Sequence, residues 1–239
     1  MTIRVATYNL HGLRDSVPAL TRVVTAMRAD ALCVQEAPGF LRWRARRRAL
    51  GAATGLRQAT QDRAGGTAVY VGKRARVLHA GTHALRAFAG LERRFLAVAV
   101  VAAGDARLAV GSLHLDLNGS ARAHHAAEAM AIMEDVAAAY EAVIVLGADV
   151  NEREDRPAWR FLAGRAADCY AVAPKGDGLT FPSRSPSARI DGVFAEREAR
   201  VVSCGGADAS IADLAAASDH LPVVAELRVE HGAELRVGH

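Results

Sequence analysis

The chain has 239 residues, a length that one layered α/β domain can occupy, and 51% of them are hydrophobic, which is enough for a sizeable core. Aromatic residues make up only 5%, which argues against a surface that binds single strands by stacking their bases. There is no apolar span of about 18 residues and no secretion signal before the first strand, so we expect neither a transmembrane helix nor export. We expect a single domain over residues 1–239, with its core at about 2–229 and a frayed C-terminal tail.

The formal net charge is +4, but the charges are distributed unevenly along the chain. Residues 1–100 contain 17 Arg and Lys against 5 Asp and Glu, whereas residues 101–239 contain 13 against 21. A basic N-terminal half indicates a surface that binds phosphates. An arginine-biased coding composition is an alternative explanation, because only two of the 30 cationic residues are lysine.

The three cysteines, Cys33, Cys169 and Cys204, are far apart in the sequence and form no C-x-x-C pair. This spacing disfavours a zinc site or a redox role. We expect buried free thiols in a reducing compartment, and therefore a cytoplasmic protein.

In chain order, the first elements alternate between buried strands and helices. A strand over 2–10 is followed by a helix that begins after Ser16, a favourable N-cap residue, and ends at about Arg28. A strand over 31–36 precedes a helix over 38–51. This helix carries five arginines, which are Arg42, Arg44, Arg46, Arg47 and Arg48. They point around the helix, so we interpret them mainly as a solvated face, with a dedicated phosphate site as the alternative.

The middle of the chain predicts a run of antiparallel strands. They are expected over 56–60, 67–71, 76–80, 84–88, 95–102 and 107–115. Gly104-Asp105 forms the hairpin turn between the last two. Ser120 then opens an alanine-rich helix that ends at about residue 140. His124, His125 and Glu128 of this helix share one side, but a third ligand is lacking, so a polar helix face is the simpler interpretation than a metal site.

The last third of the chain mixes short strands with loops. Strands are expected over 142–147, 189–194, 199–204 and 221–229, a helix over 157–163, and loops over 175–178 and 183–187. Across the chain, runs of antiparallel-type strands stand between helices, which is not strict βαβ alternation. The pattern predicts an α/β fold in which two mostly antiparallel sheets pack face to face with helices outside.

Polar side chains stand at the ends of most of these strands. The clearest case is AVIVLGADVN (142–151), in which an apolar strand ends in Asp149 and Asn151, two residues apart. The full set is Asn9, Glu36, His114, Asp116, Asp149, Asn151, Asp191, Asp219 and His220. Taken alone, Asp149 and Asn151 fit a turn cap as well as a site. Six separate caps of this kind are improbable, so we expect the strand ends to converge.

A converged cluster of this composition has a specific chemistry. So many carboxylates share one site only when a cation neutralises them. Oxygen ligands without thiolate favour Mg²⁺ or Mn²⁺ over zinc. Because Mg²⁺ with few protein ligands usually serves substrate phosphates, the cluster indicates metal-assisted phosphoryl or phosphodiester hydrolysis.

Eight short motifs strengthen this interpretation. They are TYNLHG (7–12), VQE (34–36), GGTAV (65–69), SLHLD (112–116), GADVNE (147–152), TF (180–181), RIDGVF (189–194) and SDHLPVVAEL (218–227). In this order they resemble the endonuclease/exonuclease/phosphatase superfamily over residues 7–226. The resemblance implies a four-layer α/β sandwich of the DNase I type, which agrees with the expected layers.

The resemblance also implies roles for individual residues. Glu36 resembles the principal metal-binding carboxylate, with Asn9 beside it, and Asp219 is assigned to the metal as well. Asp149 resembles the residue that orients or deprotonates the attacking water. Asn151 is expected to hold the phosphate or that water.

The two histidines are expected to act on the phosphate. His220 resembles the residue that contacts the scissile phosphate, with Asp219 as its partner, and His114 is expected to stabilise charge in the transition state. Asp191 is expected to support the site from behind. Further substrate contacts are assigned to His11 and Asp116. His11 stands where abasic-site endonucleases carry an aspartate, which argues against DNA-repair specificity.

Three hypotheses about function follow. The first is a divalent-metal-dependent phosphodiesterase, an endonuclease or exonuclease acting on nucleic acid by in-line attack of water on phosphorus. The second keeps the machinery but acts on a phospholipid, an inositol phosphate or another small phosphoester. The third is a non-catalytic binding module, which would require Glu36 and Asp149 to be buried away from each other.

Overall fold

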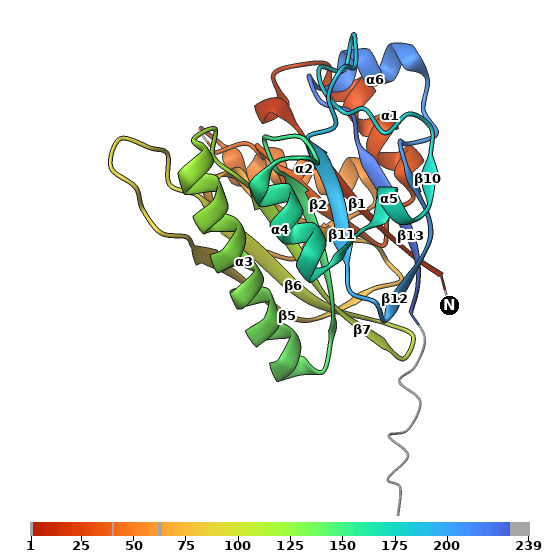
Figure 1. Cartoon of the computed structure of the whole chain (residues 1–239). Coiled ribbons are helices and arrows are strands. Elements are labelled where there is room, and N and C mark those ends of the chain that lie inside the picture. The colour runs from red at the N-terminus through yellow and green to blue at the C-terminus, as the bar shows by residue number, and fades with distance from the viewer. Residues whose placement is uncertain (1, 40, 62–63, 230–239) are drawn as a thin grey trace, which may run out of the picture.

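The computed structural model describes residues 2–39, 41–61 and 64–229, and the expected C-terminal tail lies outside them. Its strands form two mixed sheets that lie face to face (Figure 1). The seven-stranded sheet has the order β10 (Pro174–Lys175), β12 (Ala199–Gly205), β13 (Val223–Val229), β1 (Thr2–Asn9), β2 (Ala31–Gln35), β4 (Ala68–Val71) and β3 (Arg57–Gln58). The six-stranded sheet has the order β5 (Arg76–Ala84), β6 (Phe95–Ala103), β7 (Ala106–His114), β8 (Val143–Asp149), β11 (Asp191–Ala195) and β9 (Ala167–Asp168).

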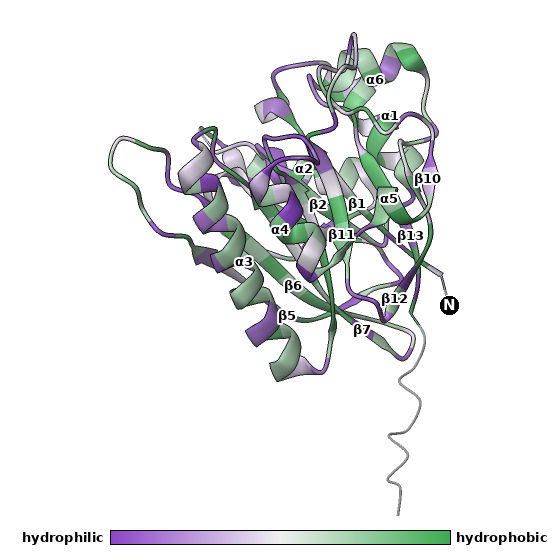
Figure 2. Cartoon of the chain, in the orientation of Figure 1, coloured by the Kyte–Doolittle hydropathy of each residue, from purple (hydrophilic) through white to green (hydrophobic). Residues whose placement is uncertain are grey.

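Helices cover the outer face of each sheet. The seven-stranded sheet is covered by α1 (Val17–Met27), α2 (Trp43–Thr54) and α6 (Ile211–Ala217), and the six-stranded sheet by α3 (Gly119–Tyr140) and α4 (Pro157–Arg165). The shorter elements are η1 (His11–Leu13), η2 (Ala64–Gly66) and α5 (Cys169–Val172). In Figure 2 the strands between the helices are largely hydrophobic, whereas polar residues line the outer sides of α3 and α4. The predicted four-layer α/β sandwich is confirmed.

The first helix illustrates how local sequence sets these layers. Ser16 accepts a hydrogen bond from the backbone of Ala19, which caps α1 where the sequence predicts. Leu20, Val23 and Met27 recur at helical spacing and are buried against β1 and β2. All three cysteines are free and buried, as expected from their spacing.

The two sheets approach closely next to the ends of β2 and β8. A Cβ atom on Gly147 would lie 2.6 Å from Cys33 Cβ and 2.9 Å from Thr7 Cβ, so only glycine fits there. Gln35 Nε2 donates to the hydroxyls of Thr7 and Ser112 at 3.1 Å, which links the sheets by buried hydrogen bonds. This contact brings the polar strand ends of both sheets to one edge of the sandwich.

Gly147→Ala is therefore expected to lower the free energy of unfolding by about 1–3 kcal/mol, because the added methyl group overpacks the sheet interface. Urea denaturation measures this. Gly164→Ala is the matched control, because a Cβ atom on Gly164 meets nothing within 4 Å. An equal effect of the two substitutions on the free energy of unfolding would contradict the account of the sheet contact.

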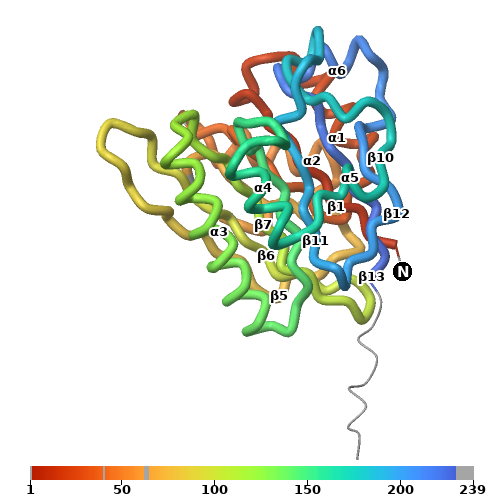
Figure 3. Tube along the Cα trace, in the orientation of Figure 1, coloured from red at the N-terminus to blue at the C-terminus, as the bar shows by residue number. Residues whose placement is uncertain are grey.

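The structure corrects the prediction for residues 76–88. The strand expected over 76–80 continues to Ala84 as β5, which pairs with β6 on both sides of Gly81 and has one bulge between Val77 and His79, so Gly81 forms no turn. Of the second expected strand, over 84–88, only Ala84 lies in a strand. After Leu85 the chain leaves the sheet and lies beside the N-terminal part of α3 (Figure 3). The backbone N–H of Arg86 donates to Glu128 at 2.8 Å, and His125 Nε2 lies 2.8 Å from Arg86 O. His125 and Glu128 thus hold this segment in place.

The helix expected over 38–51 begins later, at Trp43, and ends at Thr54. The chain before this helix is held by another segment instead, because the backbone N–H of Ala37 donates a hydrogen bond to Gly66 O at 2.7 Å. The interpretation of its arginines as a solvated face is wrong for Arg47, which is fully buried and donates from Nε to Pro38 O at 2.9 Å. The other four arginines are exposed.

Smaller differences concern the ends of elements. Asn118, and not Ser120, caps α3, because its side chain accepts hydrogen bonds from two backbone N–H groups of the first turn. The strand expected over 56–60 is limited to Arg57–Gln58. The short helices α5 and α6 were not predicted, since four and seven residues are too few for a periodic pattern to stand out.

Candidate active site

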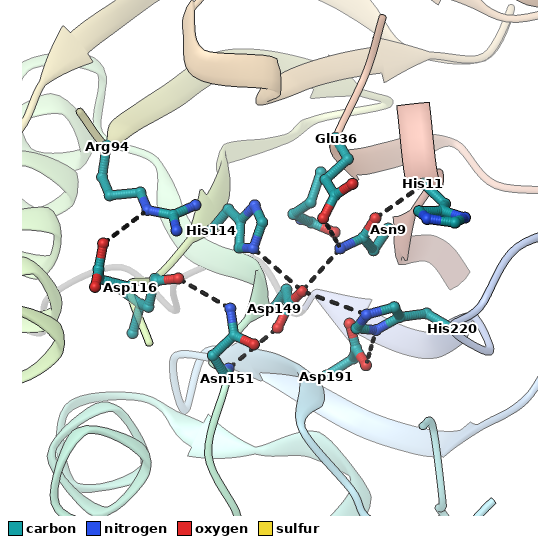
Figure 4. Close-up of polar contacts among 12 residues, drawn as sticks. Asn9, His11, Glu36, Arg94, His114, Asp116, Asp149, Asn151, Asp191 and His220 are labelled. Carbon is teal, nitrogen blue, oxygen red and sulfur yellow. Dashed lines mark hydrogen bonds and ion pairs between the residues drawn. The ribbon is translucent and has the colours of Figure 1, made fainter. Parts of the chain in front are cut away.

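Strand register places three of the predicted side chains in one row. His114 lies opposite Asp149 in the parallel pair β7–β8, and Asp149 lies opposite Asp191 in the antiparallel pair β8–β11. On the facing sheet, Asn9 ends β1 and Glu36 follows β2. Because the sheets meet at Gly147, these two groups lie close together (Figure 4).

Asp149 is the centre of the cluster. Its Oδ2 atom accepts a hydrogen bond from Asn9 Nδ2 at 2.9 Å and lies 3.4 Å from His114 Nε2 and 3.8 Å from His220 Nε2. Its Oδ1 atom accepts from the backbone of Asn151 at 3.1 Å. Asp149 is only 1% exposed, so its charge is surrounded by donors and excluded from bulk water.

Glu36 completes the opposite side of the site. Asn9 Nδ2 donates to Glu36 Oε1 at 3.2 Å as well as to Asp149, so one amide bridges two carboxylates. Glu36 and Asp149 are thus neighbours and are not buried apart, which removes the basis of the binding-module hypothesis.

The backbone around the site is strained at three residues with side chains. His11, Glu36 and Asn151 have φ values of +47°, +48° and +55°, a region that residues other than glycine rarely occupy. Gly66 supports one of them, because a Cβ atom there would lie 3.2 Å from Glu36 Cα. Strain of this kind persists only where the surrounding structure enforces it, and it concentrates at functional sites.

His220 and Asp191 form a buried pair. His220 Nδ1 lies 2.9 Å from Asp191 Oδ2, and the ring of Phe181 packs 4.9 Å from the His220 ring. Burial opposes charge on His220, but Asp191 and Asp149 outweigh it and raise its pKa to about 9. Burial and Asp149 raise the pKa of Asp191 to about 6. At neutral pH the pair is therefore an imidazolium held by a carboxylate.

His114 has the opposite character. Burial lowers its pKa, and the nearby Arg94 guanidinium adds to this effect despite the opposing charge of Asp149. Its ring is therefore neutral at neutral pH. Asp149 therefore has one charged imidazole, that of His220, and one neutral imidazole, that of His114, beside its carboxylate.

The structure corrects the prediction that Asp219 is the partner of His220. Asp219 and His220 are consecutive, but their side chains diverge: Asp219 is 42% exposed and its Oδ1 atom lies 3.8 Å from His11 Nδ1. His11 also lies 2.7 Å from Asp15. Asp219 and His11 therefore stand at the edge of the cluster, and Asp191 takes the position beside His220.

Two contributors were missed in the sequence. Arg94, directly before β6, is 9% exposed and its Nε atom lies 3.4 Å from Asp116 Oδ2, so Asp116 reaches the site through this guanidinium. Thr180 Oγ1 accepts hydrogen bonds from the backbone of Ile190 and Asp191 at 3.0 and 3.2 Å. The TF motif signalled Thr180, whereas Arg94 was hidden among many arginines.

The residues fit a hard divalent cation. Asp149, Asp191 and His220 each offer a ligand atom, and these atoms lie within 4.8 Å of one another. Asp191 Oδ1 is buried without a hydrogen-bond partner among the described residues. The amide of Asn9 stands between two carboxylates, where a cation would relieve their repulsion. The donors are mainly oxygen atoms, which suit Mg²⁺-like ions.

Comparisons with known proteins identify the family and the fold of the chain. The model of the Endonuclease/Exonuclease/phosphatase family matches residues 6–220. A search of the curated proteins finds no match. Among solved structures, an endonuclease/exonuclease/phosphatase from Bacteroides vulgatus is 19% identical and superposes with a TM-score of 0.77, covering 96% of this chain and 100% of that one.

Two further solved structures share the fold. Mannosyl-6-phosphatase from Bacteroides thetaiotaomicron is 17% identical with a TM-score of 0.77, over 95% of this chain and 99% of that one. The human Nocturnin catalytic domain, with a bound sulfate anion, is 14% identical with a TM-score of 0.74, over 96% of this chain and 95% of that one. The chain belongs to the endonuclease/exonuclease/phosphatase family, whose members are phosphoester hydrolases that typically depend on a metal.

Proposed function

We propose that the chain hydrolyses phosphodiester bonds of nucleic acid, as an endonuclease or exonuclease, with Mg²⁺ or Mn²⁺ as its cofactor. The observation that carries the proposal is the convergence of Asn9, Glu36 and Asp149 on one point beside two histidines of different charge. This arrangement offers negative groups for a cation, a base for water and donors for a phosphate.

We assign the cation to Glu36 and Asn9, with Asp149 beside them. His220 is a poorer ligand than its place near Asp149 and Asp191 suggests, because its pKa of about 9 leaves the ring protonated at neutral pH and an imidazolium offers no lone pair to a cation. Asp219 is more exposed and faces His11. When bound, the cation supplies positive charge that neutralises the phosphate and its transition state.

The remaining side chains supply the other elements of an in-line displacement. Asp149 orients the attacking water and accepts its proton, and Asn151, fixed by its bond from Nδ2 to Leu115 O at 3.0 Å, holds that water or the phosphate. The His220 imidazolium, oriented by Asp191, donates to a phosphate oxygen. His114 donates to a second oxygen as charge develops.

Nucleic acid is the favoured substrate because the arginine-rich helix α2 contacts the segment that follows Asn9. Arg46 of α2 donates to Gly12 O and Leu13 O at 3.4 and 3.1 Å, which docks this helix against the segment that follows Asn9. Arg42, Arg44 and Arg48 of the same segment are exposed. Such cations attract a polyanion through release of its counterions.

Charge reversal on α2 tests this substrate. The double variant Arg44→Glu/Arg48→Glu should slow cleavage of linearised plasmid DNA, which offers both ends and internal bonds, at least tenfold and leave hydrolysis of bis(4-nitrophenyl) phosphate unchanged. Arg197→Glu, at the exposed β11–β12 turn, is the control and should affect neither rate. Equal loss on both substrates, or no cleavage of DNA while the small diester is hydrolysed, would contradict a nucleic-acid substrate.

A small phosphoester is the second candidate. It is supported by the likeness to mannosyl-6-phosphatase over 95% of this chain and by the scarcity of aromatic residues for base stacking, with Phe181 packed on His220. Phospholipids and inositol phosphates fall in the same class.

Among the described helices, none combines the length and the apolar character needed to cross a bilayer. We further propose a cytoplasmic location, because three buried thiols without a disulfide suit a reducing compartment.

Arg94 is expected to contact the substrate phosphate. Its guanidinium lies between Asp116 and His114 in Figure 4 and is held by Asp116 at 3.4 Å. Arg94→Gln should lower kcat/KM by about 10–100-fold, the effect of losing a charged hydrogen bond of about 1.5–3 kcal/mol. Arg93→Gln is the matched control, because Arg93 is adjacent and exposed. Equal activity of the two variants would exclude this role.

A further inference from the structure

Arg122, in the first turn of α3, is a largely buried arginine to which the proposed hydrolysis assigns no role. Its side chain is 11% exposed. The Nη1 atom donates at 3.0, 3.3 and 3.0 Å to the backbone oxygens of Asp116, Leu117 and Asn151. The first two residues belong to the loop after β7, and the third belongs to the loop after β8. One side chain therefore joins the loops that follow two neighbouring strands of the six-stranded sheet.

Glu152, the last residue of the GADVNE motif, holds this guanidinium from the other side. Arg122 Nε donates to Glu152 Oε2 at 2.7 Å, and Glu152 Oε1 accepts from the backbone N–H of Trp159, in α4, at 2.9 Å. The Glu152 side chain is only 5% exposed, so both of its oxygens are engaged away from bulk water. Because a buried charge is costly unless it is paired and hydrogen-bonded, this arrangement favours one orientation of Arg122.

Asn151 is the residue that this contact holds in place. Its φ of +55° is rare for a residue other than glycine and persists only where the surrounding structure enforces it. Three hydrogen bonds do so: its backbone N–H donates to Asp149 at 3.1 Å, its Nδ2 atom donates to Leu115 O at 3.0 Å, and its backbone oxygen accepts from Arg122. Together they place the Asn151 amide beside Asp149 (Figure 4).

Arginine suits this position because of its geometry as well as its charge. The guanidinium is planar, so Nε and Nη1 reach the Glu152 carboxylate and the backbone oxygens from one rigid group. A lysine ammonium is a point charge on a flexible stem. Arg122→Lys would therefore keep a positive charge near Glu152 but would not fix the two loops relative to each other.

We propose that Arg122 is a positioning residue for Asn151 in phosphoester hydrolysis. The inference rests on the proposed function, in which Asn151 holds the attacking water or the phosphate. Arg122 acts through the backbone of Asn151, because its own nitrogens are occupied by Glu152 and by the backbone oxygens of the two loops. The effect on rate is expected to be large, since a displacement of about 1 Å in a reacting group can cost about 10²-fold.

Kinetics with bis(4-nitrophenyl) phosphate test this role. Arg122→Lys should lower kcat at least tenfold in the native background and less than twofold in the Asn151→Ala background, where no amide remains to be positioned. Arg165→Lys is the matched control, because Arg165 is an exposed arginine that pairs with Glu134 of α3, and it should lower neither rate. Melting curves establish that each variant is folded. Should Arg122→Lys be unstable, Arg122→Gln/Glu152→Gln removes both buried charges together and should give the same two results.

Proton–nitrogen NMR in EDTA tests the position of Asn151 without turnover. The side-chain amide signal of Asn151, identified by its absence from Asn151→Ala, should shift and exchange faster with water in Arg122→Lys, while the ring signals of His220 stay in place. The proposal is overturned if the Asn151 signal is unchanged, if His220 shifts as much, or if Arg122→Lys lowers kcat equally with and without Asn151. Absence of hydrolysis by the native protein would contradict the proposed function instead, and the amide signal would still decide whether Arg122 positions Asn151.

Discussion

Replacing Asp149 with asparagine is expected to lower kcat for phosphoester hydrolysis by about 10²–10⁴-fold, the range associated with loss of a general base. The change keeps the shape of the side chain but removes the charge that Asn9, His114 and His220 surround at 2.9, 3.4 and 3.8 Å. It also weakens the proposed cation site, so the required Mg²⁺ concentration should rise. Initial rates over a range of Mg²⁺ concentrations measure both effects.

Asp135→Asn is a suitable control, because Asp135 is an exposed acid on α3 and loses the same charge. Melting curves establish that both variants are folded. If Asp149→Asn kept its rate within tenfold of the native protein, Asp149 would not be the residue that activates water. Another residue would then have to be the base of the proposed mechanism.

The second large effect is expected at the pair formed by His220 and Asp191. Asp191→Asn should lower kcat by about 10²-fold or more, because it leaves His220 present but no longer oriented and charged. Since Asp191 and Asp149 together raise the pKa of His220 to about 9, the variant should also shift the His220 titration to lower pH. Proton NMR of the histidine ring in EDTA follows this shift.

Asp219→Asn is the comparison variant, because the sequence alone does not show whether Asp191 or Asp219 pairs with His220. Because Asp219 faces His11 at 3.8 Å and has the smallest effect of the three acids that raise the pKa of His220, its substitution should lower that pKa much less than Asp191→Asn does. If Asp219→Asn moved the pKa of His220 and Asp191→Asn did not, the pairing in the structure would be wrong and the sequence-based pairing would be restored.

Much of the site could be predicted because its polar residues stand at the ends of individual strands. The apolar run that ends in Asp149 and the strand that ends at His114 can both be recognised in the amino-acid sequence alone. Their convergence follows from register, which pairs His114 with Asp149 and Asp149 with Asp191. The layers were predictable for the same reason, since apolar strands and capped helices carry local signals.

The remaining features depend on contacts between segments far apart in the chain. Nothing local distinguishes Asp191 from Asp219 as the partner of His220, because the choice depends on where β11 lies. Arg47 and Arg94 resemble their neighbours in sequence, yet one is buried against Pro38 O and the other lies beside Asp116. Likewise, β5 stays in the sheet through Gly81 because β6 pairs with the residues on both sides of it.

The most direct test of the account is cleavage of plasmid DNA by the purified protein, with supercoiled plasmid for an endonuclease and nicked or linear plasmid for an exonuclease, each with and without Mg²⁺. The account predicts cleavage of at least one of these DNA forms in Mg²⁺ and none in EDTA. It also predicts that Glu36→Gln has little activity at the same Mg²⁺ concentration, because Glu36 and Asp149 share the Asn9 amide at the proposed cation site. Full cleavage by Glu36→Gln, or equal cleavage in EDTA, would contradict a metal-dependent phosphodiesterase centred on these residues.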